Sequence, residues 1–150
     1  MAKYRQVRKL TKERSAYLAG IVDGEGTITL TRKDKTQYRQ LAVTISSCEL
    51  SLVEHILAVV GAGNISKKRV YSPKHSEAYT YRLLNRQALT LLTHVYPFLR
   101  TYKRKRAALV LKYYLRLTPR NGKYSVVQLA KRELFIEKFF SLLPHNTKTR

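Results

Sequence analysis

Two short stretches of the sequence carry the side chains best suited to chemistry. Residues 23–26, Asp-Gly-Glu-Gly, alternate two carboxylates with two glycines at the end of a predicted helix. Residues 100–106 are mostly basic and would attract phosphate groups. The four histidines show no ligand spacing such as i,i+4, and the single Cys48 excludes both an internal disulfide and a multi-cysteine zinc site. A zinc or histidine-metal nuclease therefore has little support, and we expect Cys48 to be a small buried side chain.

The charge balance indicates which class of partner these residues serve. The 30 Lys and Arg residues outnumber the 9 Asp and Glu residues, which gives a formal net charge of +21. Self-repulsion of this size opposes compaction, and a polyanion would relieve it. Apolar runs such as residues 107–111 are too short to span a bilayer, so nucleic acid fits better than a membrane. A basic ribosomal protein would carry the same charge, so the balance selects a partner and not a function.

The sequence predicts one domain, 1–150, that begins with a basic N-terminal arm at residues 1–10. No Pro/Gly-rich linker or internal repeat divides its 150 residues, and 44% of them are hydrophobic, enough to bury a core. Residues 1–12 are rich in charge and lack the apolar segment of a signal peptide. We therefore expect the protein in the cytoplasm, the nucleoid or an organelle matrix, and not secreted.

Hydrophobic periodicity predicts the elements that position these side chains. A helix starts at the N-cap Thr11 and is stopped by the tight turn at residues 23–26. Period-two alternation predicts a strand at 27–33 and, after a polar turn at 33–36, a second strand with Leu41, Val43 and Ile45 inward. The remaining elements are a helix at 50–60, strands at 64–71 and 78–83, and helices at 85–99, 103–117 and 125–143. The final helix has as its expected core Val126, Leu129, Leu134, Ile136, Phe139 and Phe140.

This order, α-β-β-α-β-β-α-α-α, is that of an α+β domain with an antiparallel sheet. The predicted outward face of the sheet contains no acid, and each of its selected residues can form a hydrogen bond. They are Thr29, Thr31, Lys33, Gln40, Thr44, Ser46, Asn64, Ser66, Lys68, Thr80 and Arg82. An antiparallel strand pair fits the major groove of DNA, where such side chains meet base edges and phosphates. Tyr79 and Tyr81 are expected on the inner face, whereas a stacking platform for single-stranded RNA would want aromatic side chains outward, so this face favours duplex DNA.

Residues 18–26, Leu-Ala-Gly-Ile-Val-Asp-Gly-Glu-Gly, resemble the LAGLIDADG motif at every position within conservative exchange. The Gly-x-Gly at 61–63, Pro97-Phe98-Leu99 before a basic run, and the helix around 107–112 are also similar to single-motif LAGLIDADG homing endonucleases. The resemblance covers roughly residues 10–115. It implies the fold of that family, α-β-β-α-β-β-α plus C-terminal helices, with an antiparallel saddle-shaped sheet.

The resemblance also implies a reaction: Mg²⁺-dependent hydrolysis of both strands of a long duplex DNA site, with Mn²⁺ or Ca²⁺ able to substitute in binding. Glu25 matches the metal-binding acid and the backbone carbonyl of Gly24 a second ligand, although family members usually carry Asp where this chain has Glu. Lys103 matches the active-site lysine, with Lys105 as its fallback. The water-positioning residue, usually an amide, falls on Ser47, where this chain departs from the family, with Glu49 as fallback.

A chain with one motif implies a homodimer, which places one active site at each strand. The family's interface is a pair of packed motif helices, and small residues would let the two backbones approach closely. The resemblance assigns that interface to Leu18, Ala19, Gly20, Val22 and Asp23.

Two alternatives to the endonuclease remain open. The first is a binding module, either a maturase that assists splicing of intron RNA or a regulator that keeps the fold without chemistry; the retained Glu25 and Lys103 argue against an inactive relative. The second is a structural RNA-binding protein, which leaves the motif unexplained. The sequence gives neither the DNA target nor an intron or intein origin, although a stand-alone chain beginning at Met1 favours an intron. We expect the final helix to serve packing.

Overall fold

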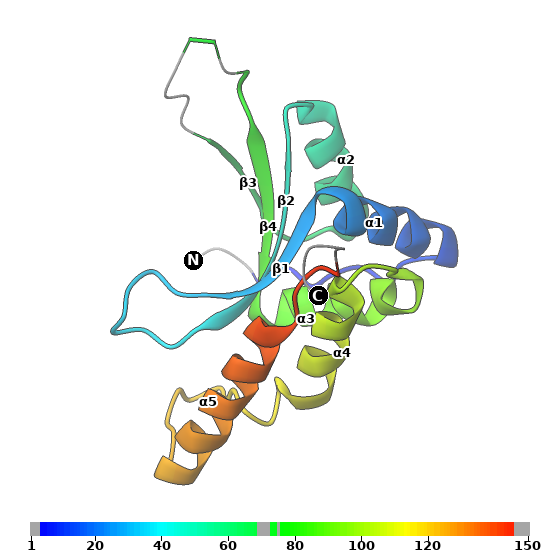
Figure 1. The fold of residues 1–150 in the computed structure, drawn as a ribbon. Coiled ribbons are helices and arrows are strands. Elements are labelled where there is room, and N and C mark those ends of the chain that lie inside the picture. Colours follow the sequence, from blue (N-terminus) through cyan, green and yellow to red (C-terminus); the bar gives the residue numbers. More distant parts are fainter. Residues whose placement is uncertain (1–3, 69–72, 75, 146–150) are drawn as a thin grey trace. The chain divides into compact units, whose positions relative to one another are not determined.

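The computed structural model describes residues 4–68, 73–74 and 76–145, and the chain divides into two compact units, Met1–Leu99 and Arg100–Arg150. The first unit contains α1 (Lys12–Glu25), β1 (Gly26–Thr31), β2 (Gln40–Ser47), α2 (Leu50–Val60), β3 (Asn64–Lys67), β4 (Tyr79–Leu84), α3 (Asn85–Val95) and the 3₁₀ turn η1 (Tyr96–Phe98). The second contains α4 (Lys103–Tyr113) and α5 (Val126–Ser141) (Figure 1). The predicted order of helices and strands is confirmed; a single domain over 1–150 stays an expectation.

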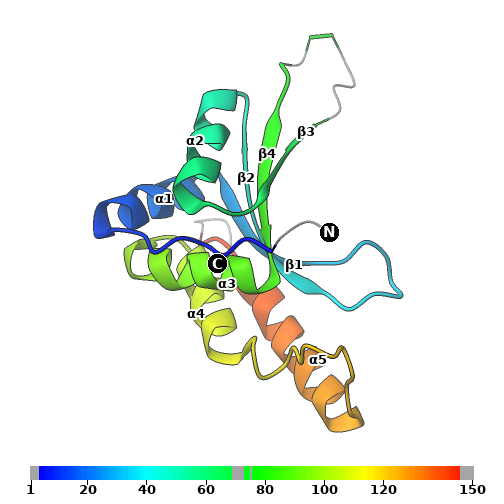
Figure 2. The same ribbon diagram turned by 180° about the vertical axis from the view of Figure 1, so that it is seen from behind.

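The sheet of the first unit is antiparallel throughout, as predicted, with strand order β1-β2-β4-β3. Helices α1, α2 and α3 pack on it, and none of these three helices lies on its polar face (Figure 2). The inward residues of the strands are aliphatic and almost fully buried, among them Leu41, Val43 and Ile45. Tyr81 is buried with them, and its hydroxyl donates a hydrogen bond to the Ala62 carbonyl. Burial raises the pKa of the Tyr81 phenol, so it stays protonated.

Helix α1 begins as predicted and ends within the predicted residues 23–26. Thr11 is its N-cap, and the Thr11 hydroxyl accepts a hydrogen bond from the Arg14 amide at 3.2 Å. The expectation that all four residues form the turn is wrong, because Asp23, Gly24 and Glu25 remain helical and Gly26 is the C-cap. The chain instead turns at Gly26, where a side chain would lie 2.7 Å from the Cα of Val22. Gly26 therefore lets β1 leave the helix at close range.

Several predicted boundaries shift for local reasons. The helix expected at 85–99 ends at Val95 and continues as the 3₁₀ turn η1, because Pro97 lacks the amide hydrogen that an α-helix needs. The third strand ends at Lys67 instead of residue 71, and residues 69–72 lie outside the described part of the chain. The polar turn at 33–36 is confirmed, with Asp34 accepting a hydrogen bond from the Thr36 amide at 2.8 Å. The expectation that Cys48 is buried is wrong, since its thiol is exposed between β2 and α2.

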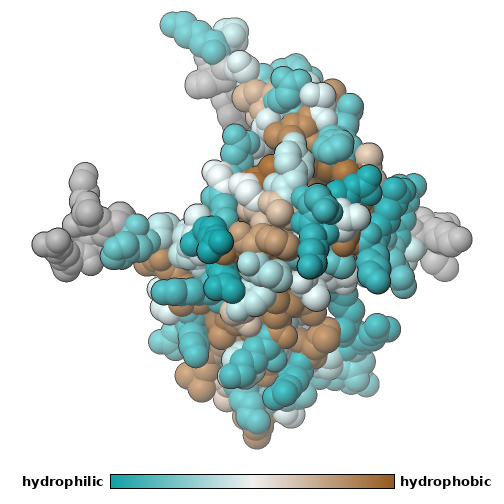
Figure 3. Space-filling model, turned by 90° about the vertical axis from the view of Figure 1, so that its right-hand side faces the viewer, coloured by the Kyte–Doolittle hydropathy of each residue, from teal (hydrophilic) through white to brown (hydrophobic). Residues whose placement is uncertain are grey.

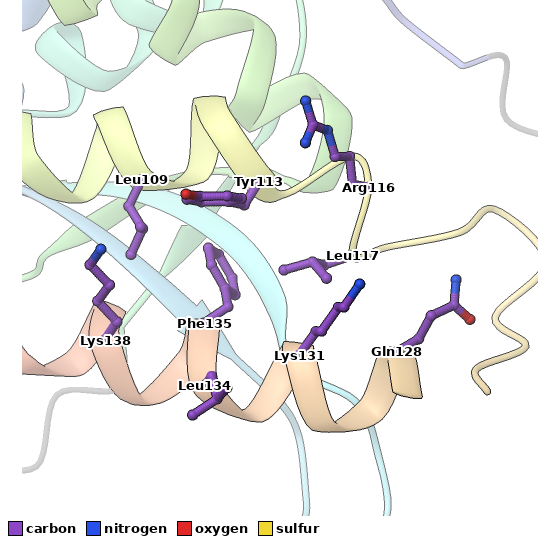
Figure 4. A pocket seen from close by; sticks show the side chains of 9 residues that line it. All are labelled: Leu109, Tyr113, Arg116, Leu117, Gln128, Lys131, Leu134, Phe135 and Lys138. Atoms are coloured by element: carbon purple, nitrogen blue, oxygen red, sulfur yellow. The ribbon is translucent and has the colours of Figure 1, made fainter. Parts of the chain in front are cut away.

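The final helix of the second unit buries fewer of its apolar residues than predicted. Ser125 caps α5 in a capping box with Gln128. The expected core of α5 is partly wrong: Val126, Leu134 and Phe140 are 85%, 67% and 36% exposed, whereas Phe135 and Arg132 are buried. A cleft of about 540 Å³ lies between α4 and α5, with the cations Arg116, Lys131 and Lys138 among its lining residues (Figure 4). No helix among the described residues is long and apolar enough to cross a membrane.

Candidate active site and nucleic-acid interface

The C-terminal end of α1 places two acids where a helix disfavours negative charge. The last carbonyl groups of a helix have no partner within it and carry a partial negative charge. Asp23 and Glu25 stand in the final turn of α1, which contains no basic residue. Glu25 is exposed, beside these carbonyls. Such an end is suited to a cation, because the charges that destabilise the bare helix end would stabilise a bound metal ion.

The donor set at this end fits a hard divalent cation. The Glu25 carboxylate and the Gly24 carbonyl offer oxygen, which Mg²⁺ prefers, and both residues are exposed. In the described part of the chain, no group of three or more His, Cys, Asp or Glu side chains could hold a metal ion. An ion bound here would therefore take its other ligands from water, from phosphate or from a second chain. The assignment of the metal to Glu25 and Gly24 stays a prediction.

Of the two candidates for the water-positioning residue, Ser47 is the last residue of β2 and Glu49 follows two residues later. Glu25 directly precedes β1, and the pairing of β1 with β2 puts Glu25 next to the last residues of β2. Ser47 is half-buried, and its hydroxyl accepts a hydrogen bond from the Glu49 amide at 3.0 Å. Glu49 is exposed, and its carboxylate accepts a hydrogen bond from the Ser51 hydroxyl at 2.7 Å. These contacts do not single out either residue.

The strand register gathers the predicted outward residues into rows on one face. Thr27, Thr44, Arg82 and Asn64 form a row across all four strands, because each pairs with the next. Ser46, Thr80 and Ser66 form a second row, and Thr31 pairs with Gln40 in a third. None of these residues is acidic. Thr27 also belongs to this face, although it is missing from the outward residues named from the sequence. The alternation of β1 indicates its outward position.

Three residues of the predicted face, Lys33, Lys68 and Thr80, differ from expectation, and two others, Ser46 and Gln40, form side-chain hydrogen bonds. Lys33 lies beyond β1 in the loop to β2. Lys68 follows β3, and its backbone amide donates a hydrogen bond to the Ala78 carbonyl at 2.8 Å. Thr80 is only 9% exposed, and its hydroxyl lies 2.8 Å from that of Ser46, so these two hydroxyls bond to each other. The Gln40 amide oxygen accepts a hydrogen bond from Asn85 at 2.7 Å.

This face also carries an apolar pair: the alternation of β2 already predicts Ala42 on it, whereas Leu84 lies one residue beyond the predicted strand 78–83. Ala42 pairs with Thr29 on one side and with Leu84 on the other. Ala42 is buried and Leu84 half-buried. The face is therefore not uniformly polar, and Leu84 is the more accessible of its two apolar residues.

The predicted dimer interface is wrong at three of its five residues. Leu18, Ala19 and Val22 are at most 1% exposed, because this side of α1 packs against β2, α3 and η1 of the same chain. Gly20 is exposed and Asp23 half-buried. The periodicity of an α-helix explains the error, since residues at i, i+1 and i+4 share one face and that face fills the core.

The opposite side of α1 carries an open groove of about 520 Å³, lined by Ala16, Tyr17, Gly20, Ile21, Gly24, Glu25 and Leu52. A Cβ added at Gly20 or Gly24 would meet nothing within 4 Å. Tyr17 is 50% exposed and packs edge-on against His55 of α2 at 6.0 Å between ring centroids. Figure 3 views the side of the first unit on which α1 and α2 lie, where hydrophobic side chains show among hydrophilic ones.

The predicted active-site lysine belongs to the second unit. Lys103 is the first residue of α4 and is 8% exposed, and its amide donates to the Thr101 hydroxyl at 3.3 Å. Its fallback, Lys105, is exposed. Most of the basic run 100–106 is thus at the surface, whereas Lys103 and Arg106 are buried. The catalytic role of Lys103 stays a prediction.

Comparison with known proteins places this architecture in a family. A family model described as LAGLIDADG endonuclease matches residues 18–115. The chain is similar to the homing endonuclease I-CvuI in complex with its target in the presence of 2 mM Ca, with a TM-score of 0.70 and 23% identity over 93% of this chain and 87% of that one.

Two further solved structures share the fold. The archaeal intron-encoded homing endonuclease I-Vdi141I complexed with DNA has a TM-score of 0.61 and 13% identity over 92% of this chain and 89% of its own. The group I intron-encoded I-CeuI complexed with DNA has a TM-score of 0.65 and 16% identity over 88% and 68%. No curated protein sequence matches the chain significantly. Because the family model spans well over half of the sequence, this chain belongs to the LAGLIDADG endonuclease family, has the homing endonuclease fold and is a DNA-cleaving enzyme.

Proposed function

We propose that this chain acts as a homodimer that cuts both strands of a long duplex DNA site, using a divalent metal ion and one active site per strand. The observation that carries the proposal is the exposed Glu25 at the C-terminal end of α1, in a last turn that contains no basic residue. This acid directly precedes β1, a strand of the acid-free sheet face. A metal-binding helix end and a DNA-binding surface thus meet in one segment.

Mg²⁺ is the proposed ion, with Mn²⁺ or Ca²⁺ able to replace it in binding; I-CvuI has been crystallised with DNA in the presence of Mg and of Ca. Bound, it would polarise the scissile phosphate and lower the pKa of an attacking water. Glu25 and the Gly24 carbonyl would hold it. Lys103 would offset negative charge on the phosphate in the transition state, and Ser47 or Glu49 would orient the water by hydrogen bonding. Asp23 is proposed to contribute to the dimer interface and not to bind the metal.

The proposed partner of the groove on α1 is a second copy of this chain. Gly20 and Gly24 are four residues apart and exposed, so they lie on one side of the helix and present no side chain. Two such helices can approach closely and gain dispersion contacts along their backbones. A symmetric pair uses the same patch twice, which suits a chain with one active-site acid at this position.

The rows of the sheet face are proposed to contact duplex DNA. The I-CvuI, I-Vdi141I and I-CeuI structures are complexes with their target or with DNA. In this chain Arg82 and Lys68 can meet phosphates or guanine, and Gln40, Asn64 and the hydroxyls can meet other base edges. The site of action is proposed to be a DNA-containing compartment: the cytoplasm with its nucleoid or an organelle matrix. Intron RNA is the alternative partner, and the experiment below distinguishes it from duplex DNA.

The test is cleavage of a randomised duplex library with Mg²⁺, comparing the wild-type protein with Glu25→Gln. Wild type should produce double-strand cuts at a discrete set of sequences. The variant should lose at least about 100-fold in cutting rate, as expected when one electrostatic catalytic group is removed. It should still shift the selected duplex in a gel, because a lost carboxylate no longer repels phosphate.

A second readout separates metal binding from activity. Mg²⁺ should raise the melting temperature of wild type more than that of Glu25→Gln, because a ligand that binds only the folded state stabilises it. Failure of both proteins to cut, together with tight binding to structured intron RNA, would replace the endonuclease with a maturase or RNA-binding role.

A further inference from the structure

The N-terminal arm is fixed to the first unit and does not extend freely from it. The Arg8 amide donates to the Val60 carbonyl at 2.9 Å, and the Arg8 guanidinium donates to the Ala58 carbonyl at 3.1 Å. Both acceptors are carbonyls near the end of α2, where the helix leaves them unsatisfied. Leu10 is 8% exposed and anchors the other end of the arm. Figure 2 shows the arm in blue, running from the start of α1 past the ends of α2 and α3.

Two further contacts set the direction of the arm. Gly61 has a φ of 78°, and a side chain there would lie 2.7 Å from the Arg8 guanidinium, so this glycine makes room for Arg8. The side-chain amide of Gln87, on α3, donates to the Arg5 carbonyl. The backbone from Arg5 to Arg8 is thus held by two helices that also cover the sheet.

The arm leads to the edge of the polar sheet face that is proposed to bind DNA. Tyr4 and Arg5 line one open groove with Gly63, Asn64 and Ile65, at the start of the edge strand β3. Asn64 is the outermost member of the row that crosses all four strands. Tyr4 is 65% exposed and Arg5 is also exposed. Over the part of the chain that the structure describes, no carboxylate pairs with the Arg5 guanidinium.

We propose that the anchored arm extends the nucleic-acid surface past β3, and that Arg5 binds a backbone phosphate of the duplex there. The inference rests on the proposed binding of duplex DNA and adds a contact outside the sheet. A phosphate suits this position because an unpaired, exposed guanidinium binds phosphate strongly and without regard to base sequence. Anchoring by Arg8 and Gln87 strengthens the contact, because less conformational freedom is lost on binding.

The test measures affinity for a random-sequence duplex, so it requires no target site. Fluorescence anisotropy without metal, at several salt concentrations between about 50 and 200 mM, gives the slope of log K against log salt. Arg5→Gln should weaken binding and reduce that slope by about one, the change expected for one lost phosphate contact. The matched control is Lys12→Gln, which removes the same charge at the exposed start of α1, the opposite end of that helix from Glu25 and β1.

Gln87→Ala separates position from charge. It changes no charge and removes the anchor of Arg5, so it should weaken binding while the melting temperature stays close to that of wild type. Equal affinities and slopes for Arg5→Gln and Lys12→Gln would overturn the proposal, as would a Gln87→Ala protein that binds like wild type. A wild-type protein that binds no duplex at all would instead refute the proposed function from which the inference starts.

Discussion

The two units of this chain bury different kinds of side chain. In the first unit the buried set is almost entirely aliphatic, and its buried polar members are the small Ser15 and Thr80. In the second unit three cations, Lys103, Arg106 and Arg132, are buried together with Ala107, Leu109, Val110, Tyr114, Phe135 and Phe139. A sheet covered by helices encloses enough apolar surface to form a core, whereas two helices and a loop enclose little.

Two arginines pack among the apolar side chains of the second unit. The Arg132 guanidinium donates to the Leu117 carbonyl at 2.8 Å and the Thr118 hydroxyl at 3.0 Å, beyond the end of α4. Arg106 donates to the Leu142 carbonyl at 3.0 Å and lies 4.7 Å from the ring centroid of Phe139. Burial lowers the pKa of Arg106, although its interaction with Tyr102 opposes this. Arginine stems thus fill space while their heads bond carbonyl groups that the helices leave free.

The largest expected effect tests which side of α5 forms the core of the second unit. Phe135→Ala should lower the free energy of unfolding by about 3–5 kcal/mol, because it empties a site that is 6% exposed. The neighbouring Leu134→Ala, at 67% exposure, should change it by no more than about 0.5 kcal/mol. Urea denaturation measures both, and similar losses for the two variants would show that the core of α5 has been assigned to the wrong side.

The next effect tests the two sides of α1 in the first unit. Leu18→Ala should cost about 2–5 kcal/mol of folding free energy, because Leu18 fills the core of its own chain. Gly20→Leu, on the exposed side, should instead raise the dimer dissociation constant at least tenfold, about 1.4 kcal/mol. Chemical denaturation and sedimentation velocity separate the two outcomes. A Leu18→Ala protein that keeps its stability and loses only dimerisation would return Leu18 to the interface.

The smallest effect concerns the arginines. Arg132→Met keeps an unbranched apolar stem and removes the hydrogen bonds to residues 117 and 118, so it should cost about 1–3 kcal/mol. Amide exchange should accelerate around residues 114–125 and stay unchanged in the sheet. Arg132→Lys, which keeps the charge without the planar guanidinium, should recover only part of the loss. An unchanged exchange pattern in Arg132→Met would show that this buried cation does not stabilise the second unit.

The same contrast explains how far the sequence alone could lead. The polar face of the sheet was predictable because strands alternate strictly, and a single inward series such as Leu41, Val43 and Ile45 fixes every outward neighbour. The buried face of α1 could also have been predicted from periodicity. Its buried residues form one helical stripe, made of Ser15, Leu18, Ala19 and Val22. The interface was assigned from motif positions instead, and three of its five residues were wrong.

The second unit was less predictable for a physical reason. Val126, Leu134 and Phe139 all have the hydrophobicity of core residues, but only Phe139 is buried among them. Apolar spacing cannot reveal that Arg132 takes a core position, because a charged residue is normally assigned to solvent. Its burial depends on acceptors at Leu117 and Thr118, which a helical pattern does not place.

The most direct test of one Glu25 site per strand uses dimers with one active subunit. Differently tagged wild-type and Glu25→Gln chains are co-expressed, the mixed dimer is purified by both tags, and it is incubated with Mg²⁺ and a supercoiled plasmid that carries a site recovered from the library. If each subunit cuts one strand with its own Glu25, the mixed dimer should nick the plasmid and leave open circles. The wild-type dimer should linearise the plasmid, and the dimer with Glu25→Gln in both subunits should leave it supercoiled. Linear product from the mixed dimer at the wild-type rate would contradict the account, because one Glu25 would then suffice for both strands.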